Sequence, residues 1–65
     1  MIIVDLIKEF MYQKNKTIAD VAKGTGLSTD IIRSIVVNDV IPSPEVADKI
    51  FKYFGVSLEE VLSLY

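Results

Sequence analysis

The sequence predicts a compact all-α domain built from five short helices. Three observations carry this prediction. Apolar residues recur every three or four positions along most of the chain, which is the spacing of one helix face. Polar residues suited to helix capping precede several of these segments. Glycine, asparagine and proline stand where the segments end. The chain has 65 residues, so we expect residues 1–65 to form a single domain.

The first helix is predicted over residues 3–14, because five apolar residues in it share helical spacing: Ile3, Leu6, Ile7, Phe10 and Met11. Residues 1–4 are also rich in β-competent side chains. A short N-terminal edge strand, pairing across a dimer, is therefore an alternative for this segment. Asn15 tolerates the left-handed backbone conformation that ends a helix.

The second helix is expected at about residues 18–24. Thr17 can cap its N-terminus, and Asp20 three residues later can cap in return. Gly26 suits the positive φ of a tight turn. Residues 24 and 26 are both glycine, but no Gly-Lys-Ser/Thr sequence follows them, so they do not form a phosphate-binding loop.

The third helix is expected at about residues 29–36, with Ser28 as its N-cap. Ile32 and Ile35 form its buried edge. Asn38 is expected to close the helix, since asparagine can take the left-handed position that glycine usually occupies.

Two more helices are predicted in the C-terminal third. Ser43 is a suitable N-cap, with Pro44 at the first helical position. The fourth helix therefore begins here, and Gly55 is expected to end it. Its apolar face consists of Val46, Ala47, Ile50, Phe51 and Phe54. The residues at 57–60, Ser-Leu-Glu-Glu, read as a capping box that opens a fifth helix.

Composition excludes several classes of function. The chain has no cysteine and no histidine, which removes disulfides, thiolate zinc sites and most pairs of nucleophile and base. We expect no metal, no cofactor and no enzymatic activity. No apolar run approaches the ~20 residues of a membrane span. A cytoplasmic location is expected. The hydrophobic fraction of 51% predicts either a dense core or an apolar surface that a partner covers.

Residues 17–35, TIADVAKGTGLSTDIIRSI, and the apolar tail of residues 50–62 resemble the Cro/phage-repressor (Xre-like) helix-turn-helix family, in particular its small dimeric repressors. The resemblance spans nearly the whole chain. It implies that the helix at 29–36 is a recognition helix that enters the DNA major groove.

The resemblance assigns base contacts to the exposed face of that helix: Ser28, Thr29, Asp30, Arg33, Ser34 and Val37. Thr17 and Ile18 would lie against phosphate. The lysines on the same side, Lys14, Lys16 and Lys23, are candidates for weak phosphate contacts. The alternatives are a surface ion pair between Arg33 and Asp30, and lysines that only make the surface soluble.

The chain departs from the family pattern at three places. Met11 and Val36 stand where the family has an arginine paired with a glutamate, and we expect these two apolar residues to touch. The loop after the third helix is usually basic, but here it is Asn38-Asp39-Val40-Ile41. The third helix carries one basic residue, Arg33, and one acidic residue, Asp30. The whole chain has nine acidic and seven basic residues, a net charge of −2. This balance predicts few phosphate contacts.

The sequence therefore predicts a transcriptional regulator, a repressor, that binds double-stranded DNA as a homodimer on an inverted repeat. A regulatory protein partner is a further expectation. Leu64 and Tyr65, with Val40 and Ile41, are candidates for dimer or partner contacts. The alternative function is a protein-interaction module, which could be antitoxin-like, an anti-repressor or the first domain of a longer protein. It would bind through Ile31, Val37, Val40 and Ile41.

Overall fold

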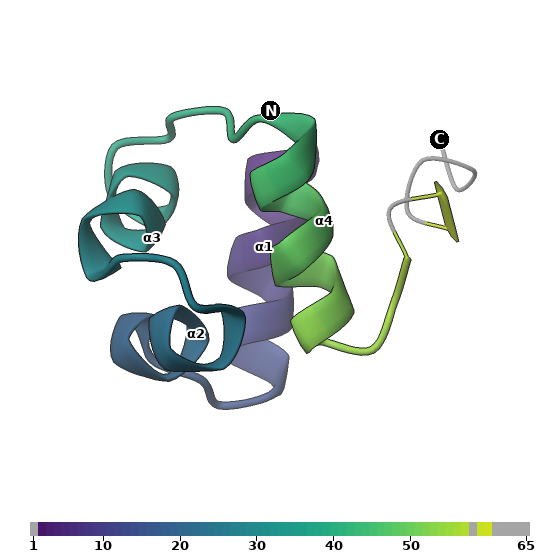
Figure 1. The fold of residues 1–65 in the computed structure, drawn as a ribbon, viewed down its shortest axis with the longest axis horizontal. Helices are drawn as coiled ribbons and strands as arrows, with labels where there is room; N and C mark the ends of the chain where they lie inside the picture. Colours follow the sequence, from purple (N-terminus) through teal and green to yellow (C-terminus); the bar gives the residue numbers. More distant parts are fainter. Residues whose placement is uncertain (1, 58, 61–65) are drawn as a thin grey trace.

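The computed structural model describes residues 2–57, 59 and 60 of the chain. Four helices form this part, and no strand occurs in it. In chain order they are α1 (Ile2–Gln13), α2 (Ile18–Thr25), α3 (Thr29–Val36) and α4 (Pro44–Tyr53), as Figure 1 shows. The all-α prediction is confirmed, and the bounds of α3 are those that the sequence predicts.

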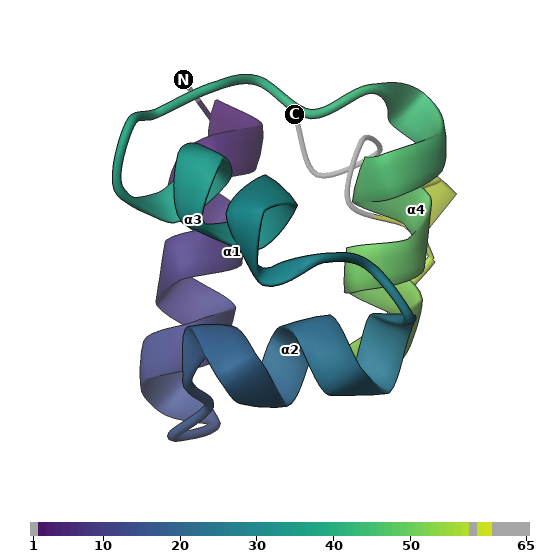
Figure 2. The same ribbon diagram turned by 60° about the vertical axis from the view of Figure 1, so that its left-hand side comes forward.

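The four helices enclose one apolar core. α1 packs against α3 and α4, and α2 packs against the same two helices, so each helix has two neighbours. Figure 2 shows α3 in front, with α2 crossing below it. Every helix contributes to the core, whose buried members are Val4, Ile7, Met11, Val21, Ala22, Ile32, Ile35, Ala47, Ile50 and Phe51.

Residues 2–4 are helical, so the alternative of an edge strand is not supported. α1 begins at Ile2 and includes these three residues of the β-competent segment. Val4, Ile7 and Met11 are all buried in the core. Their spacing of three and four residues places them on one helix face, whereas a strand would turn alternate residues away from the core. Burial of this face therefore outweighs the β-propensity of the segment.

The predicted N-caps of α2, α3 and α4 are confirmed. The Thr17 hydroxyl accepts a hydrogen bond from the Asp20 N–H at 3.1 Å, and the Asp20 carboxylate accepts one from the Thr17 N–H at 3.0 Å. Ser28 caps α3, and Ser43 caps α4 with Pro44 in its first turn. These residues satisfy N–H groups that have no partner within their helices.

The end of α3 differs from the prediction. Val37 is the C-cap, and the left-handed residue is Asp39 (φ 56°), not Asn38. The Asp39 carboxylate accepts a hydrogen bond from the Lys8 ammonium, and this ion pair ties the loop to α1. No local pattern in the sequence indicates this contact between Lys8 and Asp39. The left-handed residue therefore lies one position later than predicted, at Asp39 instead of Asn38.

A complete fifth helix is not supported, because Leu58 and residues 61–65 lie outside the described residues. Its predicted start is visible, since the Ser57 hydroxyl accepts a hydrogen bond from the Glu60 N–H at 3.1 Å. The expected contacts of Leu64 and Tyr65 also lie outside the described part.

The substitution of the family ion pair by apolar residues is accommodated by the core. Met11 is buried, and Val36 is half-buried against the same cluster, where α1 meets α3. Replacement of an ion pair by well-packed apolar groups can be neutral or stabilising. A direct contact between the two side chains remains a prediction.

Candidate nucleic-acid interface

The helix α3 presents one polar face to solvent because its opposite face is fixed in the core. Ile32 and Ile35 are almost completely buried, and they set the rotation of the helix about its axis. The turn before it contains Gly26 with φ 77°, a left-handed conformation that favours glycine. Five of the six predicted base-contacting residues are exposed, while Ser34 is half-buried.

Thr29, Arg33 and Val37 follow one another at intervals of four residues and form an exposed stripe along α3. The Arg33 guanidinium lies 3.9 Å from the Asp30 carboxylate, so the surface ion pair considered above is present. The pair is well exposed and therefore weak. An arginine in such a pair retains N–H groups that can bind a second acceptor.

Ser34 is partly engaged within the helix. Its hydroxyl donates a hydrogen bond to the Ile31 carbonyl at 2.8 Å, which leaves only its acceptor capacity for a base. The Ser28 hydroxyl accepts from the Ile31 N–H at 3.2 Å, and its proton can still be donated. The hydroxyl of Thr29 makes no hydrogen bond with the described residues.

The beginning of α2 offers backbone groups more than side chains. The Thr17 hydroxyl and N–H are both used in the capping box. The Ile18 side chain is half-buried against the core and has no polar group, so a phosphate contact at this residue would have to use its backbone N–H. The first N–H groups of α2 carry the partial positive charge of a helix N-terminus, which favours an anion.

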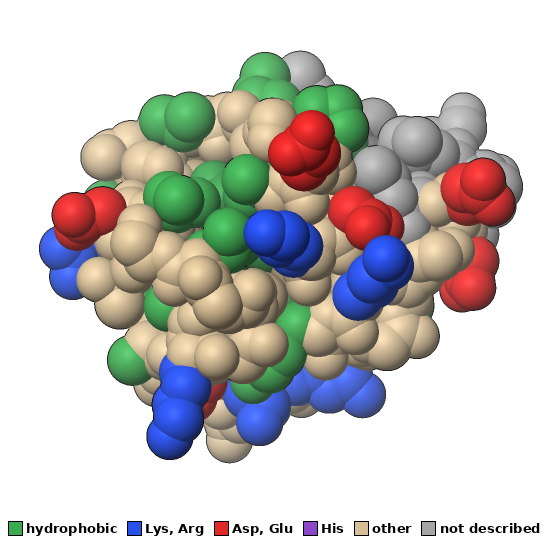
Figure 3. All heavy atoms as spheres, viewed as in Figure 1, with side chains coloured by type: hydrophobic (Ala, Val, Ile, Leu, Met, Phe, Trp, Pro, Cys, Tyr) green, Lys and Arg blue, Asp and Glu red, His purple; other side chains and the backbone are tan. Residues whose placement is uncertain are grey.

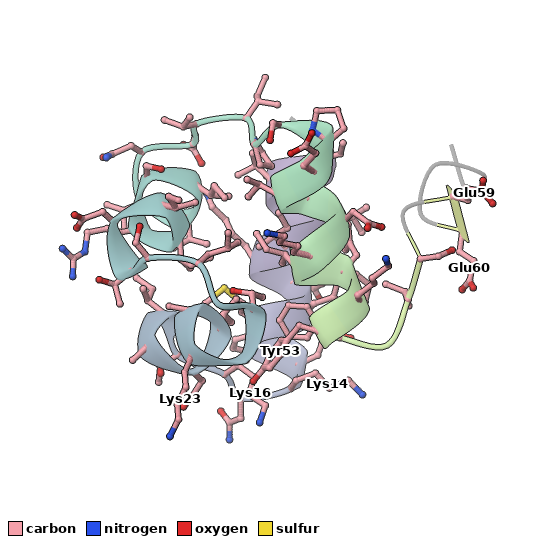
Figure 4. All side chains as sticks on the ribbon, in the orientation of Figure 1. Lys14, Lys16, Lys23, Tyr53, Glu59 and Glu60 are labelled. Carbon is pink, nitrogen blue, oxygen red and sulfur yellow. The ribbon has the colours of Figure 1, made fainter. Side chains whose placement is uncertain are left out.

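Lys14, Lys16 and Lys23 gather on one side of the molecule, below α2 and the end of α1 (Figure 4). All three are exposed, and none of them forms an ion pair with the described residues. Figure 3 shows Lys and Arg side chains along this lower edge, while hydrophobic side chains gather above. The structure therefore supplies a local excess of positive charge on an acidic protein.

Asp20 is the acid beside these lysines. Its pKa is lowered chiefly because its carboxylate accepts the Thr17 backbone and side-chain hydrogen bonds, with smaller contributions from the charges of Lys16 and Lys23. Its oxygen atoms are directed to the cap of α2, and it does not form a short ion pair with either lysine.

A hollow of about 320 Å³ opens on the same side, lined by Lys14, Lys16, Tyr53 and Phe54. Tyr53 and Phe54 follow each other at the end of α4. Their rings pack edge to face, with the ring centroids 5.1 Å apart. Tyr53 lies against Gly24, where a Cβ atom would be only 2.0 Å from its Cε1. The absence of a side chain at residue 24 therefore lets the tyrosine ring lie on α2.

α3 and the following loop carry an apolar patch, whose members are Ile31 in the first turn of α3 and Val37, Val40 and Ile41 at its end and in the loop. Val37, Val40 and Ile41 are 61%, 50% and 55% exposed. Ile31 is less open, at 38%. Asp39 in the middle of the loop is paired with Lys8, so the loop carries no unpaired charge between residues 37 and 41.

A family model described as helix-turn-helix matches residues 7–61 of the chain. The chain belongs to the Cro/phage-repressor (Xre-like) helix-turn-helix family. No curated protein and no solved structure matches it. The family is one of DNA-binding regulators, and the matched residues include all of α2, α3 and α4. No helix in the described residues is long and apolar enough to cross a membrane.

Several features of this helix-turn-helix surface were missed from the sequence. Phe54 was predicted only as part of the apolar face of the fourth helix, and Tyr53 was given no role, although both line the hollow. The ion pair between Lys8 and Asp39 joins residues 31 positions apart, so no local signal predicts it. Tyr12 of α1 is 83% exposed. Its position outside the apolar stripe of this helix is the sequence signal that could have predicted its exposure.

Proposed function

We propose that this helix-turn-helix protein is a sequence-specific transcriptional repressor that inserts α3 into the DNA major groove as a homodimer. The observation that carries the proposal is the stripe of Thr29, Arg33 and Val37 on a helix whose opposite face is buried. A rigidly held helix with an exposed mixed surface is what base-edge recognition requires.

The chemistry of the α3 face suits several base edges. Arg33 can donate two hydrogen bonds to guanine O6 and N7, which contributes about 1–3 kcal/mol of discrimination. Asp30 can accept from cytosine N4, and the hydroxyls of Ser28 and Thr29 can bond either kind of edge. Val37 can contact a thymine methyl group. Ser34, with its donor already used, would serve only as an acceptor.

Phosphate contacts in this proposal come from the α2 side of the domain. α2 begins at Ile18 after its N-cap Thr17. Lys14 and Lys16 precede this N-terminus in the chain, and Lys23 lies in the last turn of the same helix. The first helix of a helix-turn-helix crosses the DNA backbone. Because the loop after α3 contains no basic residue and its Asp39 is paired with Lys8, this side would supply most of the electrostatic attraction.

Two-fold symmetry in the dimer would place the two α3 helices in successive major grooves, ~34–36 Å apart. An eight-residue helix is only ~12 Å long. The apolar patch at the end of α3 would bring the two helices too close if it formed the two-fold interface. The dimer contact is therefore expected elsewhere on the domain, and an inverted-repeat operator is the expected site.

The test is DNA binding by Arg33→Ala, measured by fluorescence anisotropy against a duplex selected from random-sequence DNA. A matched control is Lys52→Ala, which also removes one cation from a helical ion pair, because Lys52 lies 3.0 Å from Asp48 on α4. Arg33→Ala should reduce discrimination between the selected duplex and scrambled DNA, with almost unchanged thermal stability. Lys52→Ala should leave discrimination intact. Equal discrimination by both variants would contradict the assignment of α3 as the reading helix.

A second candidate function is a protein-interaction module, and the exposed apolar patch favours it. Val40→Ser together with Ile41→Ser would remove most of the exposed apolar surface of the loop. In a DNA regulator these changes should leave salt-dependent DNA binding in place. If the wild-type protein binds no DNA even at low salt, and instead binds a protein with little salt dependence, the interaction module is the better description.

A further inference from the structure

The hollow beside the end of α4 combines positive charge with apolar walls. Lys14 and Lys16 come from the connection between α1 and α2, while Tyr53 and Phe54 come from the end of α4. No carboxylate lines the hollow. Figure 4 shows Tyr53 directed to the lower side of the molecule, where the lysines lie.

The polar groups around the hollow are available to a ligand. Neither lysine has an ion-pair partner in the described part of the chain, and the Tyr53 hydroxyl makes no hydrogen bond there. Glu59 and Glu60, labelled on the right of Figure 4, belong to the segment after α4 and lie apart from the labelled lysines at the lower edge. The acidic residues of that segment therefore do not neutralise the hollow.

These groups match a phosphate. Two ammonium groups supply charge and donors, and a phenol hydroxyl supplies one more donor. A recess with charge of one sign and low-dielectric walls concentrates the electrostatic field, which strengthens the attraction of an anion. The rings of Tyr53 and Phe54 form such a wall.

The source of the phosphate follows from the place of the hollow in the fold. Lys16 immediately precedes Thr17, the N-cap of α2, and this helix crosses the DNA backbone in a helix-turn-helix. An anion held between Lys14 and Lys16 would thus continue the line of phosphate contacts that begins at the helix N-terminus.

We infer that Lys14, Lys16 and Tyr53 form a seat for one phosphate of the operator backbone, outside the base pairs that α3 reads. The inference rests on the proposed function and adds a defined second contact to it. The seat takes over the role of the loop after α3, whose Asp39 is paired with Lys8 and which carries no basic residue. Gly24 maintains the seat indirectly, because it lets the Tyr53 ring lie against α2.

The experiment pairs protein variants with neutralised DNA phosphates. Lys14→Gln/Lys16→Gln is compared with Lys49→Gln/Lys52→Gln, which removes the same two charges from α4. Each protein is titrated by anisotropy with the selected operator and with duplexes that carry one methylphosphonate at successive backbone positions. Tyr53→Phe, which keeps the ring but removes the hydroxyl, tests the third donor.

The seat predicts that the Lys14/Lys16 variant has a salt slope (log K against log salt) shallower by about 1 to 2 per protomer. The α4 control should keep a slope closer to that of the wild-type protein. One methylphosphonate position in each half-site should weaken the wild-type protein but not the Lys14/Lys16 variant. Tyr53→Phe should show a smaller loss, removed by the same methylphosphonate.

Other outcomes would overturn the seat. If both double variants have the same salt slope and no phosphate position is coupled to Lys14 and Lys16, the seat is absent. The effect of Arg33→Ala on discrimination still tests separately whether α3 reads the bases. If inorganic phosphate shifts the NMR signals of Lys14, Lys16 and Tyr53 without any coupled backbone position, the hollow takes a free anion instead. Loss of dimerisation in the Lys14/Lys16 variant would assign the hollow to a second copy of the chain. Absence of DNA binding by the wild-type protein would remove both proposals.

Discussion

The contact between Gly24 and Tyr53 provides a direct test of how α2 and α4 fit together. A Cβ atom at residue 24 would lie 2.0 Å from Tyr53 Cε1 and 2.4 Å from its Cδ1, and all three nearest atoms belong to this ring. Alanine is favoured over glycine within a helix by about 1 kcal/mol. Overpacking of a contact costs roughly 1–3 kcal/mol. Gly24→Ala should therefore destabilise the wild-type domain by about 0–2 kcal/mol, the difference between these two effects.

The effect of Gly24→Ala on stability should have the opposite sign when the Tyr53 ring is removed. In a Tyr53→Ala background, Gly24→Ala has no ring to displace, and it should stabilise the domain by up to about 1 kcal/mol. Urea unfolding of the four proteins gives the coupling free energy, which should be about 1–3 kcal/mol. An equal effect of Gly24→Ala in both backgrounds would refute the reasoning, since it would mean that the ring does not restrict residue 24.

Three further predictions concern the core and the cap of α2. Ile35→Ala should destabilise the domain by about 2–5 kcal/mol, because the side chain is 1% exposed; a near-zero change in urea unfolding would contradict its burial. Met11→Arg alone should cost about 3–5 kcal/mol as an unpaired buried charge, and adding Val36→Glu should recover most of this loss if the two positions touch; no recovery would show that they do not. The pKa of Asp20 is lowered by the hydrogen bonds of the capping box, so its stabilising contribution is present above the ordinary carboxyl pKa and is lost as the pH falls through the lowered value. Asp20→Asn should therefore be less stable than the wild-type protein at pH 7, with a difference that shrinks in acid, and a difference independent of pH would oppose this explanation.

Local signals were sufficient for most helix boundaries. Thr17, Ser28 and Ser43 were identified as caps because each must reach only the N–H group three residues ahead. Gly26 was placed in the left-handed turn for an equally local reason. The bounds of α3 followed from these two kinds of signal, and so did its division into a buried and an exposed face.

Errors arose where distant contacts compete with local preferences. The N-terminal segment has β-competent residues, but one face of the helix that it forms completes the core. Burial of this face favours the helix α1 over a strand. Asn38 suits a left-handed position by its own chemistry. The chain uses Asp39 there, whose carboxylate meets Lys8 from α1.

The order of residues was sufficient to predict the family, the all-α class, the N-caps and the exposed face of α3. These properties depend on residues within one helical turn or on a periodic pattern, and both are visible in the order of residues. Only the tertiary structure decided that the lysines lie beside the Tyr53 and Phe54 rings, that Gly24 accommodates Tyr53, and that Lys8 holds Asp39. The physical reason is that each of these contacts joins separate helices or loops, whose relative positions are set by packing of the shared core.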